Sequence, residues 1–564
     1  MLRHIAACVI VLTVTMTALP AQSHAQSGQN AALVGTVRDA TGAVLPGATV
    51  TISSSALLGG PKSTQTDAAG GYRLAVLPPG AYDVLTTLSE FTSVRREGIK
   101  LPPGATITVD IELPVASMTD VLTVRGQAPM VDVKSSSSPA RIDQDLLHHL
   151  PTSRSIADLI NLAPGIAADV SFGGSQKSNA LFVEGLTTTE PSFQDTFAAA
   201  RFNYNWVEQV QIVALGANAE YGGFTGVAAN SILRSGSNRF SGLGEFWTTQ
   251  PNWLGRNTES LSQELQENFA PRQILSWWDT SAQLGGPLAR DRAWFFAGWQ
   301  HAKHEDRPAG FIGSGARDER NLQLLLKLSA AITPHVRIEG FSQKGRTSVD
   351  GENIDRYTPI EASNVVNMPQ TTWNLHLTWV IGSHTAVEAR HSGYVIPYSE
   401  EPRPPATRSG PAPHWDTLTQ RLSGNAWYYS GQESSEQATS VVVTHRADRV
   451  LGRSHELKAG VEFETTRTRS EDGYPGGRIY WDYDGQPDSV DFWGGESSRS
   501  TTRRGVLFAQ DSWSVSDRLT LAPGVRIELN RGSVPFKGTV FATNPISPRI
   551  GLAWDLTADH KTVL

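Results

Sequence analysis

Cysteine is almost absent from this chain, since Cys8 is the single one among 564 residues. Cys8 lies in an N-terminal apolar run from Ile5 to Leu19, which follows a short basic start and precedes small residues that end at Ala25. This order predicts a secretory signal peptide over residues 1–25, cleaved between Ala25 and Gln26. A lipoprotein site at Cys8 is the alternative, but the apolar run continues past Cys8, where such a site would end it. The mature chain then has no cysteine, which excludes disulfides and thiolate chemistry.

Long apolar runs and blocks of like charge are also missing. After the leader, no run supplies the ~20 apolar residues of a membrane-spanning helix. The 48 basic and 55 acidic residues give a net charge of −7 without a basic block, which argues against nucleic acid as a partner. The hydrophobic share of 39% is low for an ordinary apolar core. A β-barrel with a lipid-facing exterior and a wet lumen would have this composition.

Residues 31–114 show short β-branched runs separated by glycine, proline and aspartate, with strands expected at residues 33–37, 48–52, 72–76 and 82–86. This pattern predicts a small β-sandwich. The segment resembles the carboxypeptidase regulatory-like domain, a transthyretin-like, carbohydrate-binding-like fold. The matching residues are Gly35, Val37, Asp39, Gly42, Pro46, Gly47, Ala48, Val50, Asp67, Gly70, Tyr72, Leu77, Pro78, Gly80 and Tyr82. The resemblance implies an accessory module without a peptidase centre, acting either as a spacer or in glycan or partner binding.

Three stretches between residues 140 and 242 resemble the plug domain of Oar-like TonB-dependent receptors. The first is Leu150, Pro151, Arg154, Ser155, Asp158, Leu159, Leu162, Pro164 and Gly165, expected to be a helix that ends at Pro164. The second runs from Leu181 to Gly185, a strand entering a turn, with Glu184 where the family usually has aspartate. The third is Val207, Glu208, Val210, Gln211, Ile212, Ala219, Glu220, Tyr221, Gly222, Gly226, Val227, Asn230, Arg234, Ser235, Gly236, Asn238, Phe240 and Gly242. Its alternation predicts one strand through Val210 and Ile212 and a returning strand over residues 227–233.

The resemblance implies roles for named residues. The plug motif comprises Glu184, Gly185, Glu208, Glu220, Tyr221 and Gly222. Of these, Glu184, Glu220 and Tyr221 are expected to hold an α/β plug, residues 140–239, in the lumen. The linker at residues 115–139 has one strand-like stretch and a serine run over residues 135–138. Its segment Asp120, Val121, Leu122, Thr123 and Val124 is the candidate for coupling to an inner-membrane TonB-type energy-coupling protein by strand addition. An ordinary linker strand is the alternative.

Residues 240–564 alternate apolar and polar side chains with a period of two, which predicts strands. The apolar rows are Leu322, Leu324, Leu326, Leu328; Trp373, Leu375, Leu377, Trp379; Leu457, Ala459, Val461, Phe463; Val525, Ile527, Leu529; and Ile550, Leu552, Trp554. Aromatic girdles are expected at Trp294, Phe295, Phe296, Trp373, Trp379 and Trp513. Tight turns such as residues 381–383 alternate with long polar loops such as 248–276 and 400–419. This alternation is typical of outer-membrane β-barrels. We expect roughly a dozen strands of a partial antiparallel transmembrane barrel, whereas such transporters have about 22, so the chain is expected to be a truncated fragment.

A few residues are of types suited to catalysis or metal binding. Glu208 and Glu220 form a nominal carboxylate pair, but no histidine, lysine or nucleophile lies at a suitable offset. His148 with His149, and His301 with His304 and Glu305, are the nearest candidates for metal ligands. On a strand, residues three apart point to opposite faces, so the second set does not make a zinc site. We expect no enzyme activity and no cofactor.

The sequence therefore predicts a mainly β protein with an N-terminal sandwich, an α/β plug and a partial barrel. The predicted signal peptide and the resemblance imply export to the outer membrane of a Gram-negative-type bacterium, in contact with its lipid. The implied function is energised uptake of a scarce small ligand, and siderophore, oligosaccharide and peptide all remain open. The alternative is an adhesion or matrix-organising protein on the same scaffold, without transport.

Overall fold

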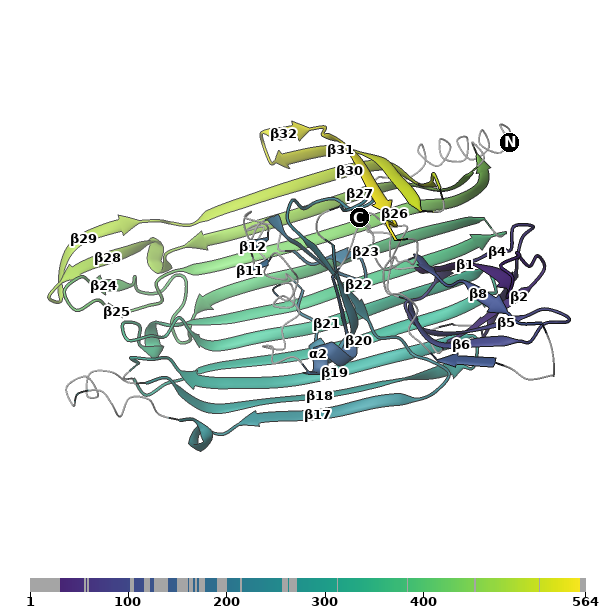
Figure 1. Cartoon of the computed structure of the whole chain (residues 1–564). Helices are drawn as coiled ribbons and strands as arrows, with labels where there is room; N and C mark the ends of the chain where they lie inside the picture. Colours follow the sequence, from purple (N-terminus) through teal and green to yellow (C-terminus); the bar gives the residue numbers. More distant parts are fainter. Residues whose placement is uncertain are drawn as a thin grey trace.

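The chain folds into a large curved wall of strands, a central α/β plug and an N-terminal sandwich (Figure 1). The computed structural model describes residues 31–54, 57, 60–101, 106–115, 122–125, 140–149, 161, 166–167, 170–171, 178–189, 200–213, 216–255, 262, 271–311, 313–382, 384–450, 453–516 and 518–557. The expected signal peptide with Ala25 and Gln26, and nearly all of the expected first plug helix, lie outside these residues.

The sandwich has two sheets around an apolar core. One sheet contains β1 (Ala31–Asp39), β4 (Gly71–Leu77), β7 (Thr106–Thr108) and β8 (Ile111–Leu113). The other has the order β3 (Lys62–Gln65), β2 (Thr49–Ser53), β5 (Gly80–Thr87), β6 (Val94–Leu101) and β9 (Leu122–Arg125). Alternate residues such as Leu33, Ile52 and Val84 are fully buried because successive side chains point to opposite faces. The four strands expected from the sequence are confirmed.

The plug is built on a five-stranded sheet. Its order is β10 (Ala140–Asp143), β15 (Val207–Val213), β16 (Ala228–Leu233), β13 (Ala180–Val183) and β14 (Leu186–Thr187), beside the small pair β11 (Ile166–Ala167) and β12 (Val170–Ser171). A helix, α2 (Gln144–His149), begins after Asp143, whose Oδ1 accepts the Leu146 N–H at 3.1 Å as an N-cap. The predicted return of the strand at Val210 as residues 227–233 is confirmed by the antiparallel pairing of β15 with β16.

The wall is one sheet of 13 strands in the described part of the chain, close to the expected dozen. The strands are β17 (Ser241–Thr249), β18 (Gln273–Ala289), β19 (Ala293–Arg307), β20 (Arg317–Thr333), β21 (Val336–Glu352), β22 (Asn364–Ile381), β23 (Thr385–Pro402), β26 (Tyr429–Val450), β27 (Arg453–Gly473), β30 (Glu496–Ser514), β31 (Leu519–Val534), β32 (Gly538–Thr543) and β33 (Ile546–Trp554). Each pairs antiparallel with its neighbours, and β31 pairs with both β32 and β33. No pairing among the described residues joins β17 to β32 or β33, so the sheet is an open, partial barrel.

The apolar side chains of the wall face outward and its polar side chains face the interior, the reverse of a soluble protein. Leu322, Leu324, Leu326 and Leu328 are each 41–49% exposed, whereas the intervening Gln323 and Lys327 are 2% and 4% exposed. The other predicted rows follow the same rule, with Leu375 and Trp379 exposed and Asn374, His376 and Thr378 buried. The alternation predicted from sequence is therefore confirmed, and its apolar side is the outer surface. This is the arrangement of a sheet with lipid outside and polar groups in its interior.

Two of the residues expected in the aromatic girdles do not face outward. Trp294 is 1% exposed and Phe296 is 3% exposed, and the Trp294 indole donates to Asn238 Oδ1 at 2.9 Å. The prediction for these two was wrong because, in a run of three aromatics, alternation turns the first and third to the interior. Trp379, at 46% exposure, lies on the outer face as expected.

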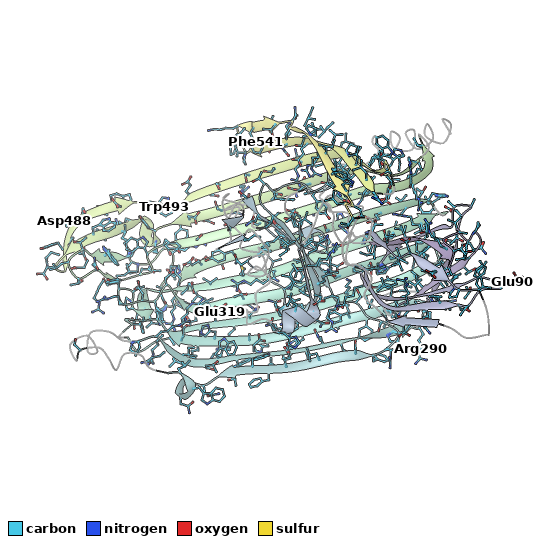
Figure 2. All side chains as sticks on the ribbon, viewed as in Figure 1. Glu90, Arg290, Glu319, Asp488, Trp493 and Phe541 are labelled. Carbon is cyan, nitrogen blue, oxygen red and sulfur yellow. The ribbon has the colours of Figure 1, made fainter. Side chains whose placement is uncertain are left out.

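The two ends of the wall differ. Tight connections, such as the one from Ala289 to Ala293, lie at the end that carries the sandwich, where Figure 2 labels Glu90 and Arg290. The opposite end carries the long loops, with Asp488 and Trp493 labelled. Two of these loops form a four-stranded sheet with the order β25 (Arg421–Ser423), β24 (His414–Asp416), β28 (Arg478–Tyr483) and β29 (Gln486–Phe492). The short 3-10 turns are η3 (Tyr204–Trp206), η4 (Pro251–Trp253), η5 (Ile360–Ala362) and η6 (Pro475–Gly477).

Candidate functional site

The candidate site is the interface between the plug and the polar inner face of the wall. The plug strands lie across the concave side of the sheet in Figure 1. Two plug turns, one at Glu184 and one at Glu220, make charged contacts with wall strands that are far away in the sequence. The family resemblance implied that these two glutamates hold the plug in the lumen, but it did not identify their partners on the wall.

The first anchor joins Glu184 to β20. Glu184 follows β13 with φ 53°, and Gly185 continues the turn with φ 77°. The Glu184 Oε1 atom accepts the Leu233 backbone N–H at 2.8 Å and the Lys327 ammonium at 2.6 Å. The same ammonium donates to the Leu233 carbonyl at 3.1 Å, and Asn374 on β22 donates to the Glu184 carbonyl at 3.0 Å. One carboxylate thus ties together two plug strands and the wall.

Because both partners are buried, the loss of either one is costly. Glu184 is 8% exposed and Lys327 is 4% exposed, so neither charge is well solvated. Removing one member of such a pair leaves the other as an uncompensated buried charge, which costs about 3–5 kcal/mol. The cost of separating the pair therefore opposes displacement of the plug from the wall.

The second anchor joins the turn at Glu220 to three wall strands. The Glu220 carboxylate pairs with Lys458 on β27, and its backbone N–H donates to Gln510 Oε1 on β30 at 2.9 Å. Arg526 on β31 donates to the Glu220 carbonyl at 3.2 Å and to Glu462 Oε2 at 2.9 Å. The Arg526 side chain is 2% exposed, and its buried charge is also compensated by Glu528, whose Oε1 accepts from Arg526 Nε at 2.6 Å.

The residues that follow Glu220 shape the turn around Arg526. A Cβ atom added at Gly222 would lie 2.3 Å from Arg526 Nε, so only glycine leaves room for the guanidinium. Tyr221 is 7% exposed, and burial, followed by the neighbouring Glu220 charge, raises the pKa of its hydroxyl well above the usual range. Tyr221 is therefore neutral and acts by packing and hydrogen bonding.

Glu208 does not belong to either anchor. Glu208 forms an ion pair at 3.6 Å with Arg234, which follows the neighbouring plug strand β16, and the Glu208 side chain is 54% exposed. Glu220 pairs instead with Lys458, so the two carboxylates contact different residues. The arrangement gives no geometric support to an acid–base pair.

Further contacts on the wall were not expected from the sequence. Gly298 on β19 makes room for the fully buried Trp206, because a Cβ there would lie 2.4 Å from Trp206 Nε1. Near the plug's loop-side end, Gln343 and Gln370 both donate to the Arg201 carbonyl, at 3.0 and 2.6 Å. The alternation along a strand predicts only that such a polar residue faces the lumen. Its plug partner is separated from it by more than a hundred residues, so no local pattern identifies it.

The candidate coupling segment is only partly described. Asp120 and Val121 lie outside the described residues, while Leu122, Thr123 and Val124 lie in β9. This strand pairs in parallel with β6, with Val94 opposite Leu122 and Glu97 opposite Arg125. The segment thus lies at the edge of the sandwich sheet, a partner that the sequence did not indicate.

The sandwich contacts both other parts. Arg73 on β4 forms an ion pair with Glu456 on β27, near the short-turn end of the wall. Lys100 on β6 lies 3.1 Å from Asp143 Oδ2 at the start of α2. One ion pair therefore joins the sandwich to the wall, and the other joins it to the plug.

The loop-end sheet gathers aromatic side chains. Trp427 lies edge-on to Trp415 and Trp481, with ring centroids 5.1 and 5.7 Å apart, and Tyr357 meets Trp415 at 6.3 Å. All four are half-buried, and they come from loops that are distant in the sequence. This aromatic cluster gives the loop end a surface suited to ring-bearing or apolar ligands.

The described part of the chain has no group of three or more histidine, cysteine, aspartate or glutamate side chains placed to hold a metal ion. The same residues include no helix with the length and apolarity needed to cross a membrane.

Comparison with known families gives two matches. Residues 32–114 match the carboxypeptidase regulatory-like domain, and residues 339–563 match the TonB dependent receptor-like β-barrel. Over 288 residues the chain is 32% identical to the TonB-dependent transporter Oar of Myxococcus xanthus, covering 48% of this chain and 26% of that protein.

Solved structures share the fold. The outer membrane transporter YddB from Escherichia coli aligns with a TM-score of 0.58 and 14% identity, over 75% of this chain and 59% of that one. FpvA of P. aeruginosa, in a complex with a pyoverdine and iron, aligns with a TM-score of 0.53 and 14% identity, over 76% and 56%. The chain thus spans about a quarter of the Oar sequence in its match and less than two thirds of these structures.

Proposed function

We propose that the chain, whose residues 339–563 match the TonB dependent receptor-like β-barrel, is an outer-membrane receptor for energised uptake of a scarce ligand. The observation that carries the proposal is that buried ion pairs join the plug to the polar inner face of the wall, whose outer face is apolar. Such a plug blocks the lumen at rest and must be loosened by work supplied from outside the barrel. We further propose the division into a signal peptide at 1–25, a sandwich at 31–114, a linker at 115–139, a plug at 140–239 and a barrel at 240–564.

The two anchors differ in how they would respond to a pull from the N-terminal side. Glu184 bonds Leu233, so displacing it disrupts the plug sheet as well as its pair with Lys327. The turn at Glu220 bonds the wall through a side chain and through backbone groups. A displacement of the turn at Glu220 therefore opens a path along the wall while leaving the plug strands paired.

The coupling partner is proposed to be an inner-membrane TonB-type protein that adds a strand at Asp120, Val121, Leu122, Thr123 and Val124. The described part of this segment is already a strand at the edge of a sheet, which favours recognition by strand addition. The ligand would enter from the opposite end, where the aromatic cluster around Trp427 lies. A siderophore, an oligosaccharide or a peptide would each be compatible with that surface.

Deletion of residues Asp120–Val124 tests this proposal. We expect the purified chain to bind the periplasmic domain of a TonB-type protein and to lose that binding on deletion, measured by calorimetry. Deletion of Ser135–Pro139 is the control of equal length in the same linker and should leave binding intact. No binding by the unmodified chain, or equal binding after both deletions, would contradict the transport proposal and favour the adhesion or matrix-organising alternative.

A further inference from the structure

A hollow lies in the outward face of the wall across β18, β19, β20 and β21. Its lining includes small side chains, Ala282, Ala297 and Ser342, and the bulkier Leu284, Trp299 and Leu324. Trp299, Leu284 and Leu324 are 37–49% exposed, so they belong to the outer surface rather than to the lumen. The hollow therefore offers an apolar channel to molecules in the surrounding membrane.

One end of the hollow is charged. Lys344 lines it, and Arg346 follows two residues later on the same outward face of β21. The residues opposite Lys344 on the flanking strands are Leu324 and Thr371, which are uncharged. The Arg346 Nε atom donates to Asn367 Oδ1 at 2.7 Å, a neutral partner that leaves the guanidinium charge uncompensated. Among the described residues, neither cation forms an ion pair with a carboxylate.

The depth of Lys344 suits a headgroup. It lies eight residues beyond Val336, the residue at which β21 leaves the short-turn end. A rise of ~3.3 Å per residue and a tilt of ~40° place it about 20 Å along the membrane normal, within a belt about 25 Å tall. A lysine there reaches the polar boundary of the outer leaflet by extending its side chain. Both cations therefore lie where lipid phosphates are found.

We propose that this hollow is a binding site for an outer-leaflet lipid that carries a phosphate monoester, as lipid A does. One acyl chain lies in the hollow against Ala282 and Ala297, and the phosphate contacts Lys344 and Arg346. A phosphate monoester has a charge of about −1.5 to −2 at neutral pH, which matches two uncompensated cations better than the single charge of a phosphodiester. The proposal rests on the proposed placement of the wall in an outer membrane.

Native mass spectrometry of the full chain released from detergent micelles tests the site, with lipid A, phosphatidylglycerol and phosphatidylethanolamine as probes. We expect one lipid A to be retained in preference to both phospholipids. Replacing both cations, as Lys344→Gln with Arg346→Gln, should weaken lipid A retention about tenfold or more. Ala297→Phe should fill the hollow and also lower retention. Arg467→Gln, a change at an exposed arginine on β27, is the matched control and should have no effect.

The outcomes separate this inference from the proposed function. Equal retention of the three lipids, preference for phosphatidylglycerol, or insensitivity to the double variant would overturn the lipid site. Placement in a membrane is measured separately, by quenching of tryptophan fluorescence in vesicles of brominated phosphatidylcholine. Absence of quenching would overturn the placement and the lipid site together, whereas quenching without selectivity for lipid A would overturn the lipid site alone.

Discussion

The ion pair between Lys327 on the wall and Glu184 on the plug can be tested by removing the lysine charge. We expect Lys327→Met to lower the free energy of unfolding by about 3–5 kcal/mol, because the Glu184 carboxylate stays buried without its cation. Urea denaturation followed by tryptophan fluorescence measures the change. The double variant Lys327→Met with Glu184→Gln should recover part of the loss, since the uncompensated charge is gone. Equal stability of the single and double variants would show that the pair is not the anchor.

Gly222 tests the second anchor at the same scale. Gly222→Ala places a methyl group 2.3 Å from Arg526 Nε, so the guanidinium must move away from Glu462 or the turn must shift. We expect a loss of about 1–3 kcal/mol, the usual range for overpacking. Gly244→Ala is the matched control, because nothing lies within 4 Å of the added Cβ on β17. Similar melting temperatures for the two variants would argue against a crowded turn.

At the scale of elements, the contact between the sandwich and α2 depends on one carboxylate. Burial raises the pKa of Asp143, but the Leu146 N–H and the Lys100 ammonium outweigh it, so the pKa lies below its usual value. A lowered folded-state pKa contributes stability above the unfolded pKa and loses it as pH falls through the folded pKa. The contact should therefore persist at neutral pH and weaken below about pH 4.

Hydrogen exchange at the start of α2 measures this pH dependence. Asp143 and Lys100 are both largely exposed, so the ion pair contributes at most about 1 kcal/mol. In the wild type, protection should fall on acidification, whereas in Asp143→Asn it should be lower at neutral pH and less sensitive to acid. A wild-type profile that stays flat down to pH 3 would contradict the assignment.

At the scale of the whole molecule, the outward leucines test the proposed placement of the wall in lipid. We expect Leu326→Arg to destabilise the membrane-inserted protein by about 2–4 kcal/mol, the cost of a basic residue near the middle of a barrel's lipid face. Leu418→Arg, at an exposed leucine in a loop, should cost far less. Urea resistance of the protein in vesicles compares the two. Equal effects would mean that the outer face of the wall is not covered by lipid.

Much of the fold could be predicted because strands and turns leave local signals. The alternation of Leu324 with Gln323 and the positive φ at Gly185 each depend on a few neighbouring residues. The inward orientation of Trp294 was missed because three consecutive aromatics do not show which of them faces lipid. The candidate site was predicted on the plug side alone, through Glu184, Glu220 and Tyr221.

The sequence by itself determined the class of structure, because period-two alternation fixes which side chains share a face of a strand. Only the tertiary structure decided that Lys327 meets Glu184, that Arg526 fills the space beside Gly222 and that β9 lies on β6. These contacts join residues tens to hundreds of positions apart. Their geometry follows from strand order and register across the whole sheet, which no local pattern encodes.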